Sequence, residues 1–188
     1  LLTATISSIF VAQKIREGKG LEKLNLTDHL ILCGWNPNGE RLLKSIQKLS
    51  KGEKKDVVLI NELNEEEISK LNNRFNALKI HVVSGDFTQE EILKKASIND
   101  VDTVIVIPNT TGSEVATYDE KTIFATLTIK SINPVIRVVA VLLDRENLTH
   151  IKRANADEVV VGDDFSTHII ASHVTDPGIP QIANKLMD

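Results

Sequence analysis

After residue 28, short runs of aliphatic and β-branched residues alternate with longer amphipathic segments, and this alternation restricts the chain to few folds. Strands that are apolar along nearly their whole length are typical of a parallel sheet covered on both faces. Six runs have this character: His29–Gly34, Asp56–Asn61, Lys79–Ser84, Asp102–Ile107, Val135–Val141 and Glu158–Val161. The sequence therefore predicts a six-stranded parallel sheet with helical crossovers.

The segments between these runs predict the crossover helices, because their apolar residues recur at the spacing of one helix face. The expected buried stripes are Leu42, Leu43, Ile46 and Leu49 in the first segment, Ile68, Leu71 and Phe75 in the second, Ile92 and Leu93 in the third, and Ile123 and Leu127 in the fourth. Right-handed crossovers then favour the strand order 3-2-1-4-5-6. The predicted fold class is α/β, with a Rossmann-like, doubly wound parallel sheet of six strands.

Both ends of the chain depart from this alternation. The first residues, LLTATISSIFVA, are uncharged, and Lys14, Arg16, Lys19 and Lys23 follow them. This pattern fits the cytoplasmic end of a membrane helix, and it fits an amphipathic helix packed on its own domain equally well. Residues 163–188 predict two short helices with much apolar surface, which we expect to pack on another domain or subunit rather than on their own sheet.

Composition argues against several functions. The chain has 22 basic and 26 acidic residues and a net charge of −4, so we expect no nucleic-acid partner. The single cysteine, Cys33, lies inside an apolar run and is expected in the core. The five histidines have no zinc-like spacing, and no nucleophile with a base can be assembled. Too few residues follow the last strand for the substrate domain of a dehydrogenase, so we expect a sensor, with neither a metal site nor catalysis.

The segment Gly34-Trp-Asn-Pro-Asn-Gly39 leads from the first strand into the first helix, and its spacing is close to the glycine-rich turn of dinucleotide-binding folds. Gly34 and Gly39 hold the first and third glycine positions, while Asn36 holds the second, where a side chain crowds a pyrophosphate. Asn36 suits an N-cap and Pro37 the first helical position, so that a helix N-terminus would face the crevice. A nucleotide site, a site for another ligand and a purely structural turn all remain open.

Other candidate ligand residues follow neighbouring strands, at the edge where doubly wound sheets bind ligands. Glu62 follows the second strand, where an acidic residue can bind a ribose, although a solvated carboxylate is an equal alternative. Asp86 follows the third strand and either faces a ligand or caps the next helix, a role that Thr88 could also take. We expect the crevice to be lined by Gly34, Asn36, Asn38, Gly39, Glu62, Asp86 and Pro108.

Five stretches together resemble one known family: HLILCGWNPNG (29–39), VVSGDFTQEEIL (82–93), DTVIVIP (102–108), TYDEKTIFATLTIKSINP (117–134) and LLDRENLTHIKRANADEVVVGDDFS (142–166). They are similar to the regulator-of-potassium-conductance (RCK) domain, or Trk-type nucleotide-binding domain, of prokaryotic ligand-gated potassium channels. The resemblance implies that residues 1–28 are the end of a pore-lining inner helix plus its linker. It implies a Rossmann-like RCK lobe at 29–162, followed at 163–188 by crossover helices for subunit packing.

The resemblance also implies the partners, the cellular location and the function of the domain. The partners are identical subunits, from a dimer up to an octameric gating ring, and the transmembrane pore of the same channel. The domain would lie at the cytoplasmic face of the cell membrane and gate the channel by a ligand-dependent conformational change, without catalysis. Two other interpretations are a soluble nucleotide-sensing subunit of a potassium uptake system and a small NAD(P)-dependent oxidoreductase.

The chain departs from the pattern of this family in two places. Val141 and Leu143 stand where the calcium-gated prototype has carboxylates on the fifth strand, and Asp86 alone cannot complete an oxygen cage. Calcium is therefore not expected at that site. Asn36 in place of the middle glycine weakens the case for ordinary NAD binding. The ligand is left unidentified, with an adenine nucleotide as one candidate.

Overall fold

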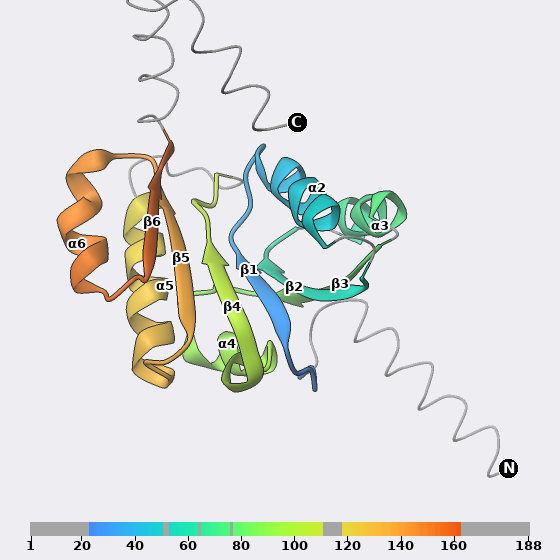
Figure 1. Cartoon of the computed structure of the whole chain (residues 1–188), viewed down its shortest axis with the longest axis horizontal. Coiled ribbons are helices and arrows are strands. Elements are labelled where there is room, and N and C mark those ends of the chain that lie inside the picture. Colours follow the sequence, from blue (N-terminus) through green and yellow to red (C-terminus); the bar gives the residue numbers. More distant parts are fainter. Residues whose placement is uncertain (1–22, 51–52, 64, 76, 111–117, 163–188) are drawn as a thin grey trace, which may run out of the picture.

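The computed structural model describes residues 23–50, 53–63, 65–75, 77–110 and 118–162. They form a six-stranded sheet in the order β3-β2-β1-β4-β5-β6, with every neighbouring pair parallel (Figure 1). The strands are β1 His29–Cys33, β2 Lys55–Asn61, β3 Leu78–Ser84, β4 Val101–Val106, β5 Arg137–Leu142 and β6 Glu158–Val161. The predicted Rossmann-like fold and strand order are confirmed, with small shifts at the strand ends.

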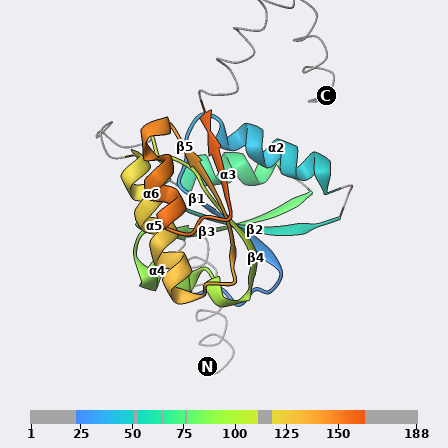
Figure 2. The ribbon, with the colours of Figure 1, turned by 60° about the vertical axis from the view of Figure 1, so that its left-hand side comes forward.

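Helices cover the sheet in two layers. The described helices are α2 Gly39–Leu49, α3 Glu65–Arg74, α4 Glu90–Lys95, α5 Tyr118–Ile132 and α6 Leu148–Arg153, with short 3₁₀ turns η1 Ile98–Asp100 and η3 Arg145–Asn147. Figure 2 shows α2 and α3 on one side of the sheet and α4, α5 and α6 on the other. This division follows from right-handed crossovers that leave the first strand in opposite directions.

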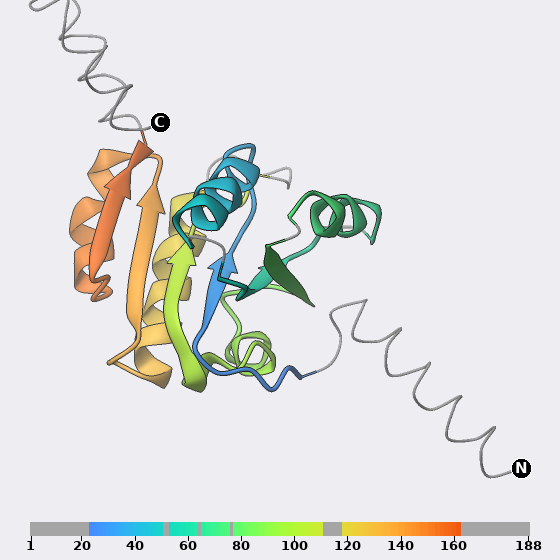
Figure 3. The same ribbon diagram turned by 45° about the vertical axis from the view of Figure 1, so that its right-hand side comes forward.

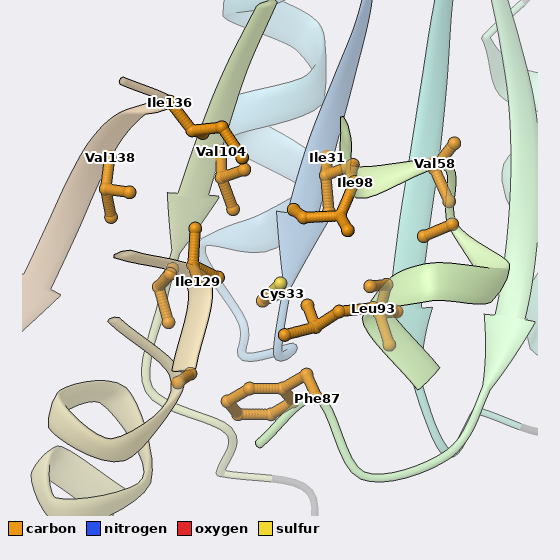
Figure 4. Close-up of a cluster of buried hydrophobic side chains, with 14 of the residues drawn as sticks. Ile31, Cys33, Val58, Phe87, Leu93, Ile98, Val104, Ile129, Ile136 and Val138 are labelled. Atoms are coloured by element: carbon orange, nitrogen blue, oxygen red, sulfur yellow. The ribbon is translucent and has the colours of Figure 1, made fainter. Parts of the chain in front are cut away.

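The largest core lies between the sheet and the α4–α5 layer. Strand β1 is buried along its whole length, as expected for a central parallel strand. Side chains from several strands and from both helices meet in this core, and Figure 4 shows seven of them: Ile31, Cys33, Val58, Leu93, Val104, Ile129 and Val138. The core position predicted for Cys33 is confirmed, and burial raises the pKa of its thiol.

Helix α2 buries less of its predicted stripe than the spacing indicates. Leu43 is fully buried, and Leu42 and Ile46 are half-buried, but Leu49 is 77% exposed. Leu49 is the last residue of the helix, beyond the point where the sheet can cover it.

Helix α5 turns a different face to the sheet from the predicted one. Ile123 is only half-buried and Leu127 is 44% exposed, whereas Thr122 and Thr126 are fully buried. The two threonines tolerate burial because each hydroxyl donates to a carbonyl four residues earlier: Thr122 to Tyr118 at 3.2 Å, and Thr126 to Thr122 at 2.8 Å. The expectation of an Ile123–Leu127 stripe is wrong. The spacing of apolar residues does not indicate that a buried threonine can form a hydrogen bond within its own helix.

One half of a sheet face lacks a helical cover among the described residues. Figure 3 shows α5 and α6 behind β5 and β6, on the side away from α2. On the near side, Val141 and Val160 pair in register, and Val160 is half-exposed. Residues 163–188, which the sequence assigns to subunit packing, lie outside the described residues.

The part of the chain that the structure describes contains no helix with both the length and the apolar character for a membrane span. The pore-lining helix end expected before residue 23 lies outside the described residues.

Lys130 joins the end of α5 to the starts of β5 and β6. Its nearly buried Nζ donates to the carbonyls of Pro134 (3.3 Å) and Ile136 (2.7 Å) and to Oδ2 of Asp157 (2.7 Å). The same carboxylate accepts a hydrogen bond from the Val138 amide at 2.6 Å. Partial burial raises the pKa of Asp157, but the hydrogen bonds from Lys130 and Val138 outweigh it, and the pKa lies below its ordinary value.

Replacing Asp157 with asparagine should therefore have an effect that depends on pH. Near neutral pH we expect a loss of about 1 kcal/mol in the free energy of unfolding, kept small by exposure of the carboxylate. Because folding lowers this pKa, the stabilisation is present above the unfolded-state pKa, about 4, and is lost as pH falls through the folded-state pKa. Thermal unfolding of both proteins across this range measures the difference. A gap that stays constant below pH of about 4 would contradict the assignment.

Candidate functional site

The turn after β1 depends on a glycine at position 34. Gly34 has a φ of +84°, and a Cβ at this position would lie 2.2 Å from the carbonyl oxygen of Ile107. The Gly34 amide donates to the Ile60 carbonyl (3.0 Å), and the Ile107 amide donates to that of Cys33 (2.9 Å). The carboxyl ends of β1, β2 and β4 are thus held together around a position that accepts no side chain.

Asn36 connects this turn to the exit of β4. Its Oδ1 accepts from the Asn38 amide at 2.9 Å, and its Nδ2 donates to the Pro108 carbonyl at 3.0 Å. The helix does not begin here, because α2 starts at Gly39 with Asn38 at the N-cap and without a side-chain cap bond. The expectation that Asn36 caps the helix and that Pro37 opens it is wrong, since the Asn36 amide is used to bridge two loops.

A pocket lies at the N-terminus of α2. Trp35 forms one wall, and its ring stands so close to buried Gly39 that a Cβ there would lie 2.8 Å from it. The pocket has a volume of about 280 Å³ and is lined by Trp35, Asn36, Pro37, Glu40, Glu67 and Thr110. This is just under the usual range of small-molecule sites, about 300–1,000 Å³, and is enough for part of a nucleotide.

A larger hollow of about 630 Å³ lies at the opposite, amino edge of the strands. Its lining includes Leu30, Ile46, Leu49 and Ile105 with a rim of mixed charge. It contains none of the residues proposed from the sequence, and ligands of doubly wound sheets bind at the carboxyl edge. The pocket beside α2 is therefore the better candidate despite its smaller size.

The structure brings some of the sequence-proposed residues together and separates others. Hydrogen bonds join Asn36 to Asn38 and to Pro108, and Gly34 and Gly39 frame the same turn. Glu62 is exposed beyond the end of β2 and does not line the pocket. Asp86 also lies outside the lining, where its Oδ1 accepts from the Thr88 amide (3.0 Å) and hydroxyl (2.9 Å). Asp86 thus closes the turn that precedes α4.

Asn61 is a polar residue at this edge that the sequence analysis missed. It ends β2, is 1% exposed, and follows Val57 and Leu59 on the face that α2 and α3 cover. Its Oδ1 accepts from the Leu63 amide at 2.8 Å, but its Nδ2 has no hydrogen-bond partner among the described residues. Leaving a buried donor unpaired costs about 1–3 kcal/mol, so this amide is a polar feature of the core that a buried water would satisfy. The sequence signal for it was its place two residues after Leu59, on the same face of the strand as Val57 and Leu59.

Asp119 was missed as well. It is 7% exposed in the first turn of α5, and its carboxylate accepts three hydrogen bonds, each of 2.9 Å, from the amides of Leu143 and Asp144 and from Nδ2 of Asn147. It thereby fixes the loop after β5 at the carboxyl edge. Across the described ranges no three acidic, histidine or cysteine side chains gather in a way that could hold a metal ion.

The sequence model of the TrkA-N domain family matches residues 30–162, which include nearly the whole sheet and the turn after β1. The chain belongs to the TrkA-N domain family. This confirms the family that the sequence motifs indicated.

Proteins similar to this TrkA-N domain include the calcium-gated potassium channel TvoK of Thermoplasma volcanium. The two are 28% identical over 186 residues, which cover 98% of this chain and 50% of TvoK. Potassium channel protein 1 of Methanocaldococcus jannaschii is 27% identical over 190 residues, with 97% of this chain and 52% of that protein covered. The chain thus spans about half the length of these relatives.

Solved structures share the fold at lower identity. GsuK bound to ADP has a TM-score of 0.60 and 18% identity, covering 85% of this chain and 39% of that one. The GsuK channel bound to NAD has a TM-score of 0.59 and 17% identity, covering 85% and 27%. The TrkA-N domain of the Escherichia coli inner membrane protein ybaL has a TM-score of 0.61 and 20% identity, covering 79% and 98%. At these identities the likeness shows the fold alone.

Proposed function

We propose that this TrkA-N domain is the ligand-sensing regulatory domain of a potassium channel. It acts at the cytoplasmic face of the membrane, assembles with identical subunits into a gating ring and carries out no catalysis. Support comes from relatives named potassium channels that match nearly the whole chain. The observation that carries the proposal is the pocket at the N-terminus of α2, because a ligand that binds one conformation of the domain better than another shifts the balance between them.

The proposed ligand is an adenine nucleotide. The first amides of α2 and the positive end of its dipole favour an anionic group at the pocket. GsuK, which shares the fold, has been solved with ADP and with NAD. The Asn36 side chain occupies the position where dinucleotide-binding folds have a glycine next to the pyrophosphate. We therefore expect a mononucleotide such as ADP to fit better than a dinucleotide.

Each residue of the proposed site has a role. Gly34 and Gly39 allow the tight turn and its close packing. Asn36 and Pro108 hold the loop in shape through their hydrogen bond, and Asn38 is the N-cap residue of α2. Glu62 and Asp86 follow β2 and β3 at the same edge of the sheet but outside the pocket lining, so they would meet only the part of a ligand that extends beyond the pocket. Glu40, which lines the pocket, is ion-paired with Arg74 at 2.5 Å, and this pair reduces its repulsion of a phosphate.

Calcium is not proposed as the ligand at the site of the calcium-gated prototype. Asp86 uses one carboxylate oxygen for Thr88, and Val141 is a hydrocarbon side chain half-buried in β5. A calcium ion needs six to eight oxygen ligands, which these positions do not supply.

The test is potassium flux through the full-length protein that carries this domain, reconstituted in lipid vesicles with ADP or NAD on the domain's side. We expect the nucleotide to change the flux, and Asn36→Ala to shift its half-effective concentration upward by about tenfold, since the loop loses a bridge worth about 1.4 kcal/mol. Ser45→Ala, an exposed change on the same helix, should respond as the wild type does. A potassium flux that does not change with ADP or NAD, or an Asn36→Ala protein with the half-effective concentration of the wild type, would contradict the proposal.

A further inference from the structure

The chain that precedes β1 is fastened to the end of α4 before it enters the sheet. The Leu24 amide donates to the Lys95 carbonyl at 2.8 Å, and the Asp28 amide donates to the Asp100 carbonyl at 3.0 Å. Leu24 and Leu26 also pack against the core beneath α4 and α5. Residues 24–28, here called the strap, are therefore part of the folded domain.

Ser97 stands at the centre of this attachment. Its hydroxyl donates to the Leu24 carbonyl at 2.5 Å and accepts from the Leu26 amide at 3.4 Å. The side chain is buried, and the backbone is left-handed, with φ +57° and ψ +43°. A residue other than glycine is strained in this conformation. Glycine would avoid that strain, but only a side chain with a hydroxyl can join both backbone groups of the strap.

Helix α4 connects Ser97 to the turn of Asp86 and Thr88. This turn precedes the helix at the carboxyl edge of the sheet, the edge at which the ligand pocket lies, and Ser97 follows the helix near the amino edge. A Cβ on Gly85 would lie 2.6 Å from the side chain of Ile92, so the backbone of this turn rests directly on the helix.

The segment between these two points is held rigidly in the core. Its side chains Phe87, Leu93 and Ile98 are buried together beside Cys33 and Ile129 (Figure 4). The six residues of α4 span about 9 Å. A packed segment this short moves as one body, because close-packed side chains leave no room for it to bend.

We infer that Ser97 is a positioning residue that fixes the preceding chain to α4, so that a shift of the Asp86–Thr88 turn when a ligand extends to it reaches the strap through this helix. The inference rests on the proposed function in one respect, namely that a nucleotide binds at the carboxyl edge. In a channel, the strap is where force would pass between the domain and the chain before it.

Hydrogen exchange of the full chain, read by mass spectrometry, tests the attachment without any ligand. We expect Ser97→Ala to speed exchange of the Leu24 and Leu26 amides about tenfold while the β1 amides keep their wild-type rates. Ser97→Gly should release the strap as well, although it removes the backbone strain. Ser131→Ala, an exposed serine on α5, is the matched control and should exchange as the wild type does. A protected strap in both Ser97 variants would overturn the inference.

The same measurement with ADP tests the transmission. In the wild type we expect ADP to slow exchange in the strap. In Ser97→Ala we expect no such response, although the fluorescence of Trp35, in the pocket wall, still reports bound ADP. Bound ADP without a change in the wild-type strap would overturn the transmission alone. If the Trp35 fluorescence did not change with ADP, both the proposed function and the transmission would be overturned. The exchange rates measured without ligand would still test the attachment of the strap.

Discussion

Gly34→Ala should destabilise the domain by about 3–5 kcal/mol, a large part of the stability of an ordinary domain. Two costs add at this position. The backbone has a φ of +84°, which costs a residue with a Cβ about 1–2 kcal/mol, and the new atom would lie 2.2 Å from the Ile107 carbonyl oxygen. Strands β1 and β4 must then separate at the edge where the ligand pocket forms. Urea unfolding followed by circular dichroism measures the loss.

Gly162→Ala is the matched control for this change. A Cβ there would meet the Leu142 carbonyl oxygen at 3.6 Å, an ordinary contact, and the backbone is not left-handed. We expect its stability to stay within about 0.5 kcal/mol of the wild type. A Gly34→Ala protein as stable as Gly162→Ala would show that the turn can open without cost, and that the described loop geometry is wrong.

Asp119→Ala is the second change with a large expected effect, a loss of about 2–3 kcal/mol. Its nearly buried carboxylate accepts hydrogen bonds from Leu143, Asp144 and Asn147, and alanine leaves all three donors without that acceptor. Asp119→Asn keeps one oxygen and turns an amide donor toward the others, so we expect a loss of about 1–2 kcal/mol.

Glu120→Ala, next to it in the same helical turn but exposed, serves as the control and should change stability by about 0.5 kcal/mol at most. Denaturant unfolding of the three variants ranks the losses. If Asp119→Ala were as mild as Glu120→Ala, the loop after β5 would be held by other contacts.

The sheet could be predicted from the sequence because each strand carries its own signal. Runs such as that before Gly34 are apolar at nearly every position, and right-handed crossovers between six such runs favour the strand order that the structure has. The inward face of α5 could not be predicted in this way. Buried Thr122 and Thr126 look polar in the sequence, and only the helix geometry shows that their hydroxyls are satisfied.

The candidate site was predicted where its residues are close in sequence and missed where they are distant. The turn from Gly34 to Gly39 is recognisable from its spacing alone. The bond between Asn36 and Pro108 joins residues 72 positions apart, and no local pattern indicates it. Asp119 reaches its partners across 24 to 28 positions, and a single sequence does not reveal contacts at such a distance.

Glu62, the ligand residue expected from the sequence, lies one position after Asn61, the buried polar residue that ends β2. The sequence pattern placed the ligand-facing residue just after β2, whereas the structure buries the last residue of the strand itself. In a strand, adjacent side chains point to opposite faces, so an error of one residue changes the chemistry from an exposed carboxylate to a buried amide.

The central claim is that the pocket at the N-terminus of α2 binds an adenine nucleotide, and Trp35 tests it directly. Trp35 is the only tryptophan of the chain and forms a wall of that pocket. The measurement is a titration of tryptophan fluorescence with ADP, excited where adenine does not absorb, in the wild type and in Asn36→Ala, which changes a residue that lines the pocket. We expect a saturable change in the wild type and an apparent Kd raised about tenfold when the hydrogen bond from Asn36 to Pro108 is removed. A folded wild-type protein whose fluorescence does not respond to ADP at any concentration would contradict the claim.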